Sequence, residues 1–146
     1  MDYKVRIKAK ATWTKAKRQL FWDALHFAHI YLDFCKMKGI GRVDFHLTGD
    51  PYAPGSCIDA DDKYIVHISG AQTEDEIVET LFHELTHVKQ YEDGHLQDID
   101  EDVVYWLGNY YRGDFQDTFS KTYWNAPWEV EARNTAEYLT NKYYQS

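Results

Sequence analysis

Hydrophobic and polar residues alternate at the start of the chain and then change their period. In residues 3–11 apolar side chains alternate with charged ones, which is the two-residue period of a half-buried β-strand. From Thr14 to about Lys38 the apolar residues recur at steps of three and four, which predicts a long amphipathic helix. Gly39 and Gly41 are expected to end this helix.

Short apolar runs bounded by turn residues predict further strands. Residues Arg42–Thr48 place apolar side chains on alternate positions and predict a second strand. Cys57–Ala60 and Tyr64–Ser69 flank a pair of aspartates and predict a hairpin. Val103–Leu107 and Tyr110–Arg112, on either side of a Gly-Asn pair, predict a smaller hairpin.

Two more helices follow from capping signals. Thr73, with Glu76 three residues later, forms a capping box that opens a helix running to about Asp93. Pro127 suits the first turn of a last helix, where its missing N–H is not needed. The predicted fold is therefore α+β, with a long N-terminal helix, a small mixed or antiparallel sheet, a central helix and a C-terminal helix. The absence of repeats and linkers predicts one domain over residues 1–146.

Composition excludes several classes of protein. A chain of 146 residues has room for about one hydrophobic core. No apolar run approaches the roughly 20 residues of a membrane span, so we expect no membrane association. The N-terminus lacks the continuous apolar segment of a signal peptide. Cys35 and Cys57 form no CxxC pair, and we expect reduced thiols in a cytoplasmic protein.

The formal charge of −8 is unevenly distributed along the chain. Residues 1–18 carry a net charge of +6, from a basic segment between Lys4 and Arg18, and the remainder carries −14. An acidic chain is a poor general binder of nucleic acid, because phosphate contacts need a positive surface. The basic segment nevertheless leaves nucleic acid as an alternative partner.

The predicted central helix contains the sequence His83-Glu84-Leu85-Thr86-His87, an HExxH motif. Residues four apart on a helix lie on one face, so both imidazoles can bind one Zn²⁺. Glu84 is then placed to act on water at the metal as a general base. Composition alone would produce roughly 0.02 such motifs in a chain of this size, so we interpret it as a zinc site.

A third protein ligand is expected from the last helix or from the loop after the central helix. Glu129 borders the apolar face of the last helix, on which two alanines allow close approach to a neighbour, and is the preferred candidate. Glu131 points away from that face and is an alternative. His95, eight residues after His87, is the other.

Aromatic residues surround the predicted site in the sequence. Trp106, Trp124 and Trp128 are expected to cover the metal side of the central helix. A tyrosine hydroxyl could stabilise the oxyanion of an acyl-transfer reaction, but the sequence does not select one of four candidates. They are Tyr110, Tyr111, Tyr123 and Tyr138.

The HExxH motif followed by a Glu129-x-x-Ala132-x-x-x-Ala136 helix resembles the gluzincin branch of the zincin metallopeptidases. It is similar to small ImmA/IrrE-like peptidases and to compact phage and bacterial zincins, and more distantly to SprT-like proteases. The resemblance implies a minimal zincin fold with a zinc cofactor, in which His83, His87 and Glu129 are ligands and Glu84 is the base. It also implies Tyr64–Ser69 as the strand beside the cleft, which could hold substrate as an added strand.

The resemblance implies a zinc-dependent hydrolase of peptide bonds, acting on a protein or peptide in the cytoplasm, or in the host cytoplasm if the chain is encoded by a phage. Two alternatives stay open. One is a non-catalytic binding module with a zincin fold, although an intact Glu84 favours an enzyme. The other is a SprT-like, DNA-associated protease that uses the basic segment from Lys4 to Arg18.

Overall fold

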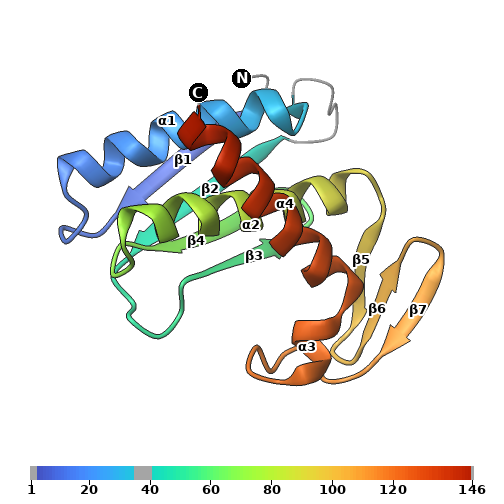
Figure 1. The fold of residues 1–146 in the computed structure, drawn as a ribbon. Helices are drawn as coiled ribbons and strands as arrows, with labels where there is room; N and C mark the ends of the chain where they lie inside the picture. The colour runs from blue at the N-terminus through green and yellow to red at the C-terminus, as the bar shows by residue number, and fades with distance from the viewer. Residues whose placement is uncertain (1–2, 35–40, 146) are drawn as a thin grey trace.

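Two β-sheets and four helices make up the part of the chain that the computed structural model describes, residues 3–34 and 41–145 (Figure 1). The larger sheet has four strands and the smaller sheet has three. The structure confirms the prediction of a single small α+β domain. None of the helices in the described ranges is long and apolar enough to cross a membrane.

The larger sheet is mixed. Its strands are β1 (Lys4–Ala9), β2 (Arg42–Thr48), β3 (Gly55–Asp59) and β4 (Tyr64–Ser69), in the spatial order β1-β2-β4-β3. β1, β2 and β4 are parallel, whereas β3 pairs antiparallel with β4 and forms one edge. The predicted strands and the first predicted hairpin are confirmed.

Helix α1 (Lys15–Tyr31) connects β1 to β2 and is shorter than the sequence predicts. The expected continuation to Lys38 is wrong for the residues described after Tyr31. Asp33 adopts a φ of 55°, in the left-handed region, which a right-handed helix cannot include. The glycine stop expected at Gly39 lies in residues 35–40, outside the described part of the chain.

The main core lies between the larger sheet and the two long helices that cover one of its faces (Figure 1). Phe45 of β2 and Ile68 of β4 are fully buried there, under Phe21 of α1 and Leu81 and Leu85 of α2 (Glu74–Glu92). The opposite face of β1 exposes charged side chains. Side chains of β1 therefore alternate between the core face and the solvent face, which produces the two-residue period of apolar and charged residues in the sequence.

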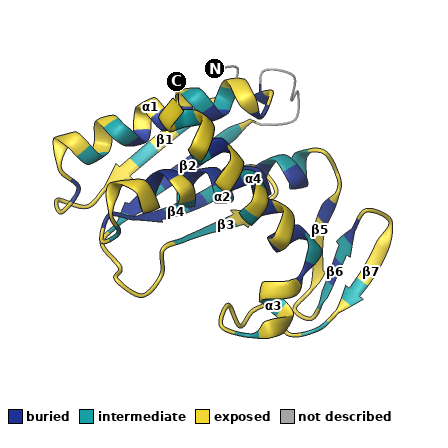
Figure 2. Cartoon of the chain, viewed as in Figure 1, coloured by how far each residue is buried: buried dark blue, intermediate teal, exposed yellow. Residues whose placement is uncertain are grey.

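Helix α2 begins as predicted and is buried on most of its circumference (Figure 2). Thr73 accepts a hydrogen bond from the backbone N–H of Glu76, and the Glu76 side chain accepts one from the backbone N–H of Thr73. This confirms the capping box. The sheet and α1 cover one side of α2, and α4 (Pro127–Gln145) packs against another side. Polar residues of α2 are therefore held at defined positions inside the protein.

A second, smaller sheet follows α2. The predicted hairpin is confirmed as β6 (Val103–Trp106) and β7 (Asn109–Arg112), which Leu107 and Gly108 connect with positive φ angles. The strand β5 (Leu96–Asp100), which pairs with β6, was not predicted from the sequence. Four of its five residues are exposed, so it lacks the apolar alternation of a half-buried strand.

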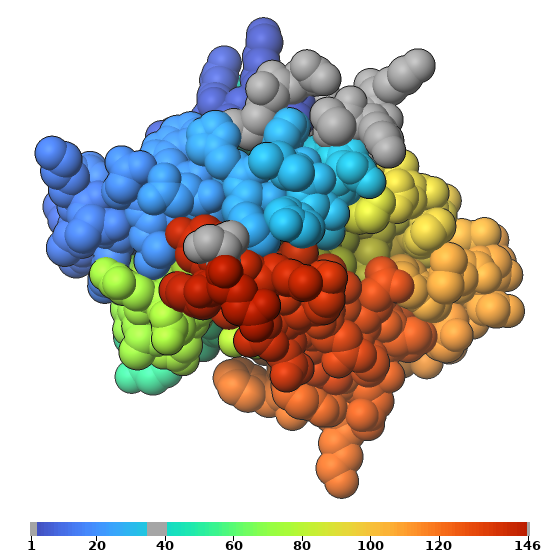
Figure 3. All heavy atoms as spheres, turned by 45° about the horizontal axis from the view of Figure 1, so that its top comes forward, coloured from blue at the N-terminus to red at the C-terminus, as the bar shows by residue number. Residues whose placement is uncertain are grey.

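The chain ends with the short helix α3 (Lys121–Asn125) and the long helix α4, whose first residue is Pro127 as predicted. α3 is a second element that the sequence analysis missed. Ala132 and Ala136 are buried where α4 packs on α2. Figure 3 shows the far end of α4 (red) lying against α1 (blue).

Cys57 is a free thiol on β3. Cys35 lies outside the described residues.

An ion pair on β2 with a buried carboxylate makes the stability of the fold depend on pH. Asp44 is 7% exposed and accepts hydrogen bonds of 2.6 and 2.7 Å from the Arg42 guanidinium, with Lys63 Nζ at 3.4 Å. The Arg42 hydrogen bonds outweigh the effect of burial and lower the pKa of Asp44 to about 2.

We predict that Asp44→Asn flattens the pH dependence of the unfolding free energy between about pH 4 and pH 2. The pKa of Asp44 is lower in the folded chain than the value of about 3.9 for an unfolded chain, so its contribution is complete above pH 4 and is lost as the pH falls toward 2. Urea unfolding followed by tryptophan fluorescence measures this. Asp61→Asn, in an exposed turn, is the control. Parallel curves for Asp44→Asn and the wild type would contradict the prediction.

Candidate metal centre

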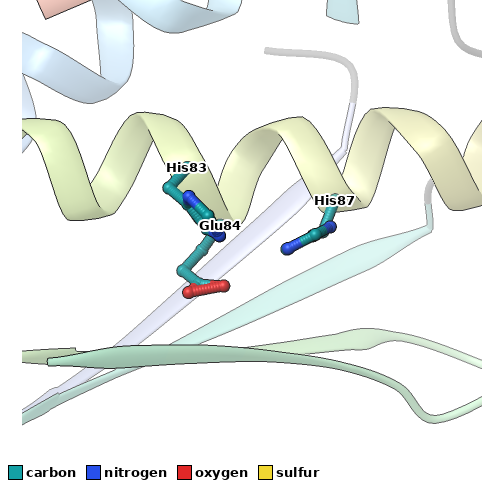
Figure 4. A group of neighbouring side chains, drawn as sticks. All are labelled: His83, Glu84 and His87. Carbon is teal, nitrogen blue, oxygen red and sulfur yellow. The ribbon is translucent and has the colours of Figure 1, made fainter. Parts of the chain in front are cut away.

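Three polar side chains of the HExxH sequence project from one side of α2 (Figure 4). His83, Glu84 and His87 place potential ligand atoms within 4.8 Å of one another. The two histidines are one helical turn apart, and their ring centroids are 4.9 Å apart. Glu84 and His87 are each 6% exposed. This group can hold a metal ion.

Glu129, the preferred third ligand from the sequence, lies between the two imidazoles. Its Oε1 is 3.0 Å from His83 Nε2, and its Oε2 is 2.9 Å from His87 Nε2. Glu129 belongs to the first turn of α4 and is 4% exposed. Packing of α4 on α2 therefore adds a buried carboxylate, distant in sequence, to the histidine pair.

Charge compensation keeps Glu129 ionised in spite of its burial. Burial raises the pKa of a carboxyl group, but the contacts with His83 and His87 outweigh burial and lower the pKa of Glu129 to about 2. Burial lowers the pKa of His87, because it disfavours the charged imidazolium. The Glu129 carboxylate outweighs this effect of burial and raises the pKa of His87 to about 9. The buried carboxylate and the imidazoles thus stabilise one another.

Glu84 has a different environment from Glu129. Burial raises its pKa, and the nearby histidines oppose that rise only in part. Its carboxylate lies beside the first residue of β3, because a Cβ atom on Gly55 would be 3.2 Å from Glu84 Oε2 and 2.5 Å from Thr80 Cγ2. The lack of a side chain at Gly55 lets the edge strand approach α2 at this point.

Gln90, which was not predicted from the sequence, orients His87. The Gln90 amide Nε2 donates to Trp128 O at 3.0 Å and to Glu131 Oε1 at 3.1 Å. Its Oε1 therefore faces His87 Nδ1, 2.7 Å away, and that ring nitrogen is the donor. The other nitrogen, Nε2, faces Glu129. The three-residue spacing from His87 on the helix was a signal that could have identified Gln90.

Of the four candidate tyrosines, Tyr123 on α3 lies at the site. Its half-buried hydroxyl faces Glu129, and burial, with the nearby carboxylates, raises its pKa well above the usual value. It therefore remains a hydrogen-bond donor. Tyr110 and Tyr138 are 71% and 58% exposed, and Tyr111 packs edge-on against Trp128.

The alternative third ligands have other contacts. Glu131 is exposed, and its carboxylate accepts the Gln90 hydrogen bond. His95 is exposed at the start of the segment leading into β5, with its ring edge-on to Trp106. Trp106 and Trp128 are buried in a small core beside the centre, whereas Trp124 is 58% exposed. The structure thus places Glu129 beside the two histidines. Glu131 instead accepts a hydrogen bond from Gln90, the residue that contacts His87.

Two cavities meet at this centre. One has a volume of about 540 Å³ and the other of about 740 Å³. Both are lined by the same group of residues from β3, α2 and the α3–α4 region, which includes Glu84 and Glu129. The shared residues are Gly55, Ser56, Glu84, Thr118, Tyr123 and Glu129. The candidate metal centre is accordingly accessible to a ligand from two directions.

Comparisons of the chain with protein-family models, with curated proteins and with solved structures found no match.

We predict that Gln90→Leu weakens Zn²⁺ binding about 10- to 100-fold, because His87 loses the acceptor that fixes its tautomer and ring orientation. Competition with a chromophoric chelator measures the affinity, and circular dichroism verifies that the variant is folded. Gln97→Leu, on the exposed face of β5, is the matched control. Equal affinities for Gln90→Leu and Gln97→Leu would contradict a positioning role.

Proposed function

We propose that this protein is a zinc metallopeptidase of the gluzincin type with a minimal zincin fold. The observation that supports the proposal is the Glu129 carboxylate held between His83 and His87, with the Glu84 carboxylate beside them on α2. Two imidazoles and one carboxylate are the ligand set of a catalytic zinc site that keeps one position open.

The donor atoms fit zinc. Zinc–nitrogen and zinc–oxygen bonds of about 2.0–2.2 Å in a tetrahedron separate the ligand atoms by roughly 3.3 Å. The Glu129 oxygens are 3.0 and 2.9 Å from the two imidazole nitrogens, within a few tenths of an ångström of that spacing. When bound, zinc would polarise the substrate carbonyl and increase the acidity of water. His83, His87 and Glu129 would hold the ion.

Glu84 is the proposed general base. Its carboxylate takes a proton from the attacking water and later delivers it to the amine that leaves. A general base works best when its pKa lies closer to neutrality than that of an ordinary carboxylate, and burial raises the pKa of Glu84 in that direction. Glu129 does not suit this role, because its pKa is lowered.

The strand that could hold substrate is β3 and not the predicted Tyr64–Ser69. That strand, β4, is paired on both sides, with β2 and with β3, so its backbone has no free edge. β3 is an edge strand of this sheet, and its residues Gly55 and Ser56 line both cavities beside Glu84. An extended peptide could add to this edge through backbone hydrogen bonds.

The DNA-associated alternative has less support from the arrangement of the basic segment. Lys4, Arg6 and Lys8 are exposed on β1, and Lys17 Nζ donates to the backbone oxygen of Gly70 at 2.6 Å. No residue of this segment that the structure describes lines either cavity. Binding of DNA through the segment stays a prediction.

We predict that Glu84→Gln lowers the rate of peptide hydrolysis by at least about 10²-fold and leaves Zn²⁺ binding intact, since the amide cannot accept the proton but the three ligands remain. Cleavage of an unfolded protein substrate and metal content, measured on the same preparation, test this. Glu137→Gln, exposed on α4, is the control. Unchanged biological activity in Glu84→Gln would instead favour the non-catalytic binding module.

A further inference from the structure

The two cavities at the candidate centre differ in chemistry. We propose that they select a peptide with a lysine or arginine on one side of the scissile bond and a bulky apolar residue on the other. This inference depends on the proposed peptidase function, because it assigns the substrate class of that site. The cavity of about 540 Å³ is termed the acidic arm, and the cavity of about 740 Å³ the apolar arm.

The arms extend in opposite directions from the shared residues. The apolar arm is lined by Tyr52–Pro54, which precede β3, and the acidic arm by Cys57 and Ile58, further along β3. On α2, His83 lines the apolar arm and His87 lines the acidic arm. A peptide along the β3 edge would therefore pass Glu84 with residues in both arms.

The acidic arm carries more negative than positive charge, although His87, which is paired with Glu129, also lines it. Asp98, Asp100 and Glu101 line it from β5 and the turn after β5, in addition to Glu84 and Glu129. Among the residues that the structure describes, no lysine or arginine lines this cavity. Asp98 receives one hydrogen bond, from the Tyr91 hydroxyl at 2.8 Å. A cleft with charges of one sign attracts and orients a ligand of the opposite sign.

Glu84 lies where the two arms meet. It is 6% exposed, it lines both arms, and no hydrogen bond to it is present among the described residues. Its carboxylate oxygens are open to the two cavities and not sealed inside the protein, so their acceptor capacity is available to a bound molecule. A bound peptide and its attacking water would supply donors at the junction of the two arms.

The apolar arm offers aromatic surface, although Glu76, Glu79 and Arg133 also line it. Tyr52, Phe119 and Trp124 line it and are 87%, 89% and 58% exposed, although they are large hydrophobic residues. The Arg133 guanidinium lies 3.6 Å from the centre of the Trp124 ring and so covers part of that ring. Aromatic side chains gathered around a cavity are typical of sites that bind an apolar group. A phenylalanine, tyrosine or leucine of the substrate fits this chemistry.

Cleavage-site mapping tests the inference. The zinc-loaded full chain is incubated with a complex peptide mixture, and the termini produced are identified by mass spectrometry. We expect lysine and arginine to be enriched on one side of the cleaved bond and bulky apolar residues on the other. Cleavage that shows neither preference would overturn the inference and leave the peptidase proposal intact.

Charge substitution in the acidic arm tests the basic preference directly. Asp98→Asn with Asp100→Asn should lower kcat/KM about tenfold more for a lysine-containing peptide than for the same peptide with glutamine. Asp98→Lys with Asp100→Lys should shift the preference to glutamate. Asp61→Asn with Asp62→Asn, in the turn between β3 and β4, is the matched control and should change neither value. Equal losses for both peptides would contradict the assignment.

Trp124→Ala should lower kcat/KM for a phenylalanine-containing peptide more than for its alanine counterpart, which tests the apolar arm. If the wild type and Glu84→Gln both cleave nothing, the peptidase proposal fails, and binding then decides the inference. Fluorescence anisotropy of the lysine and glutamine peptides on Glu84→Gln should show a lysine preference that Asp98→Asn with Asp100→Asn removes. Equal binding of the two peptides would overturn it.

Discussion

The contact of one carboxylate with two imidazoles, Glu129 between His83 and His87, is the interaction on which the site depends. It joins the first turn of α4 to the middle of α2, two segments that are far apart in the sequence. A charged group this deeply buried is tolerated only when it is paired and hydrogen-bonded. The need for this pairing explains why α4 must dock on α2 in one register.

The surrounding structure maintains that register. Ala132 and Ala136 let α4 approach α2 closely, and Gln90 connects His87 to the backbone of Trp128, directly before Glu129. Trp128 is itself fixed by the small aromatic core under the second sheet. The second sheet therefore has two roles. It packs against the start of α4, and it lines one of the two cavities with acidic residues.

Local signals in the sequence predicted much of this arrangement. The four-residue spacing of His83 and His87 and the Thr73 capping box depend only on neighbours along one helix, so they could be read directly. Glu129 could be ranked first because it borders the apolar face of its helix. Features set by distant contacts were missed or misjudged. The edge position of β3 depends on strand order, β5 is an exposed strand with alternating acids, and the end of α1 depends on the conformation of Asp33.

X-ray absorption spectroscopy of the zinc-loaded protein tests the central claim most directly, because it reports the ligands of the bound metal. We predict one zinc per chain, with two imidazoles and otherwise oxygen ligands at about 2.0–2.2 Å. Zinc well below one equivalent, or a sulfur ligand at about 2.3 Å from a cysteine such as Cys57, would contradict it.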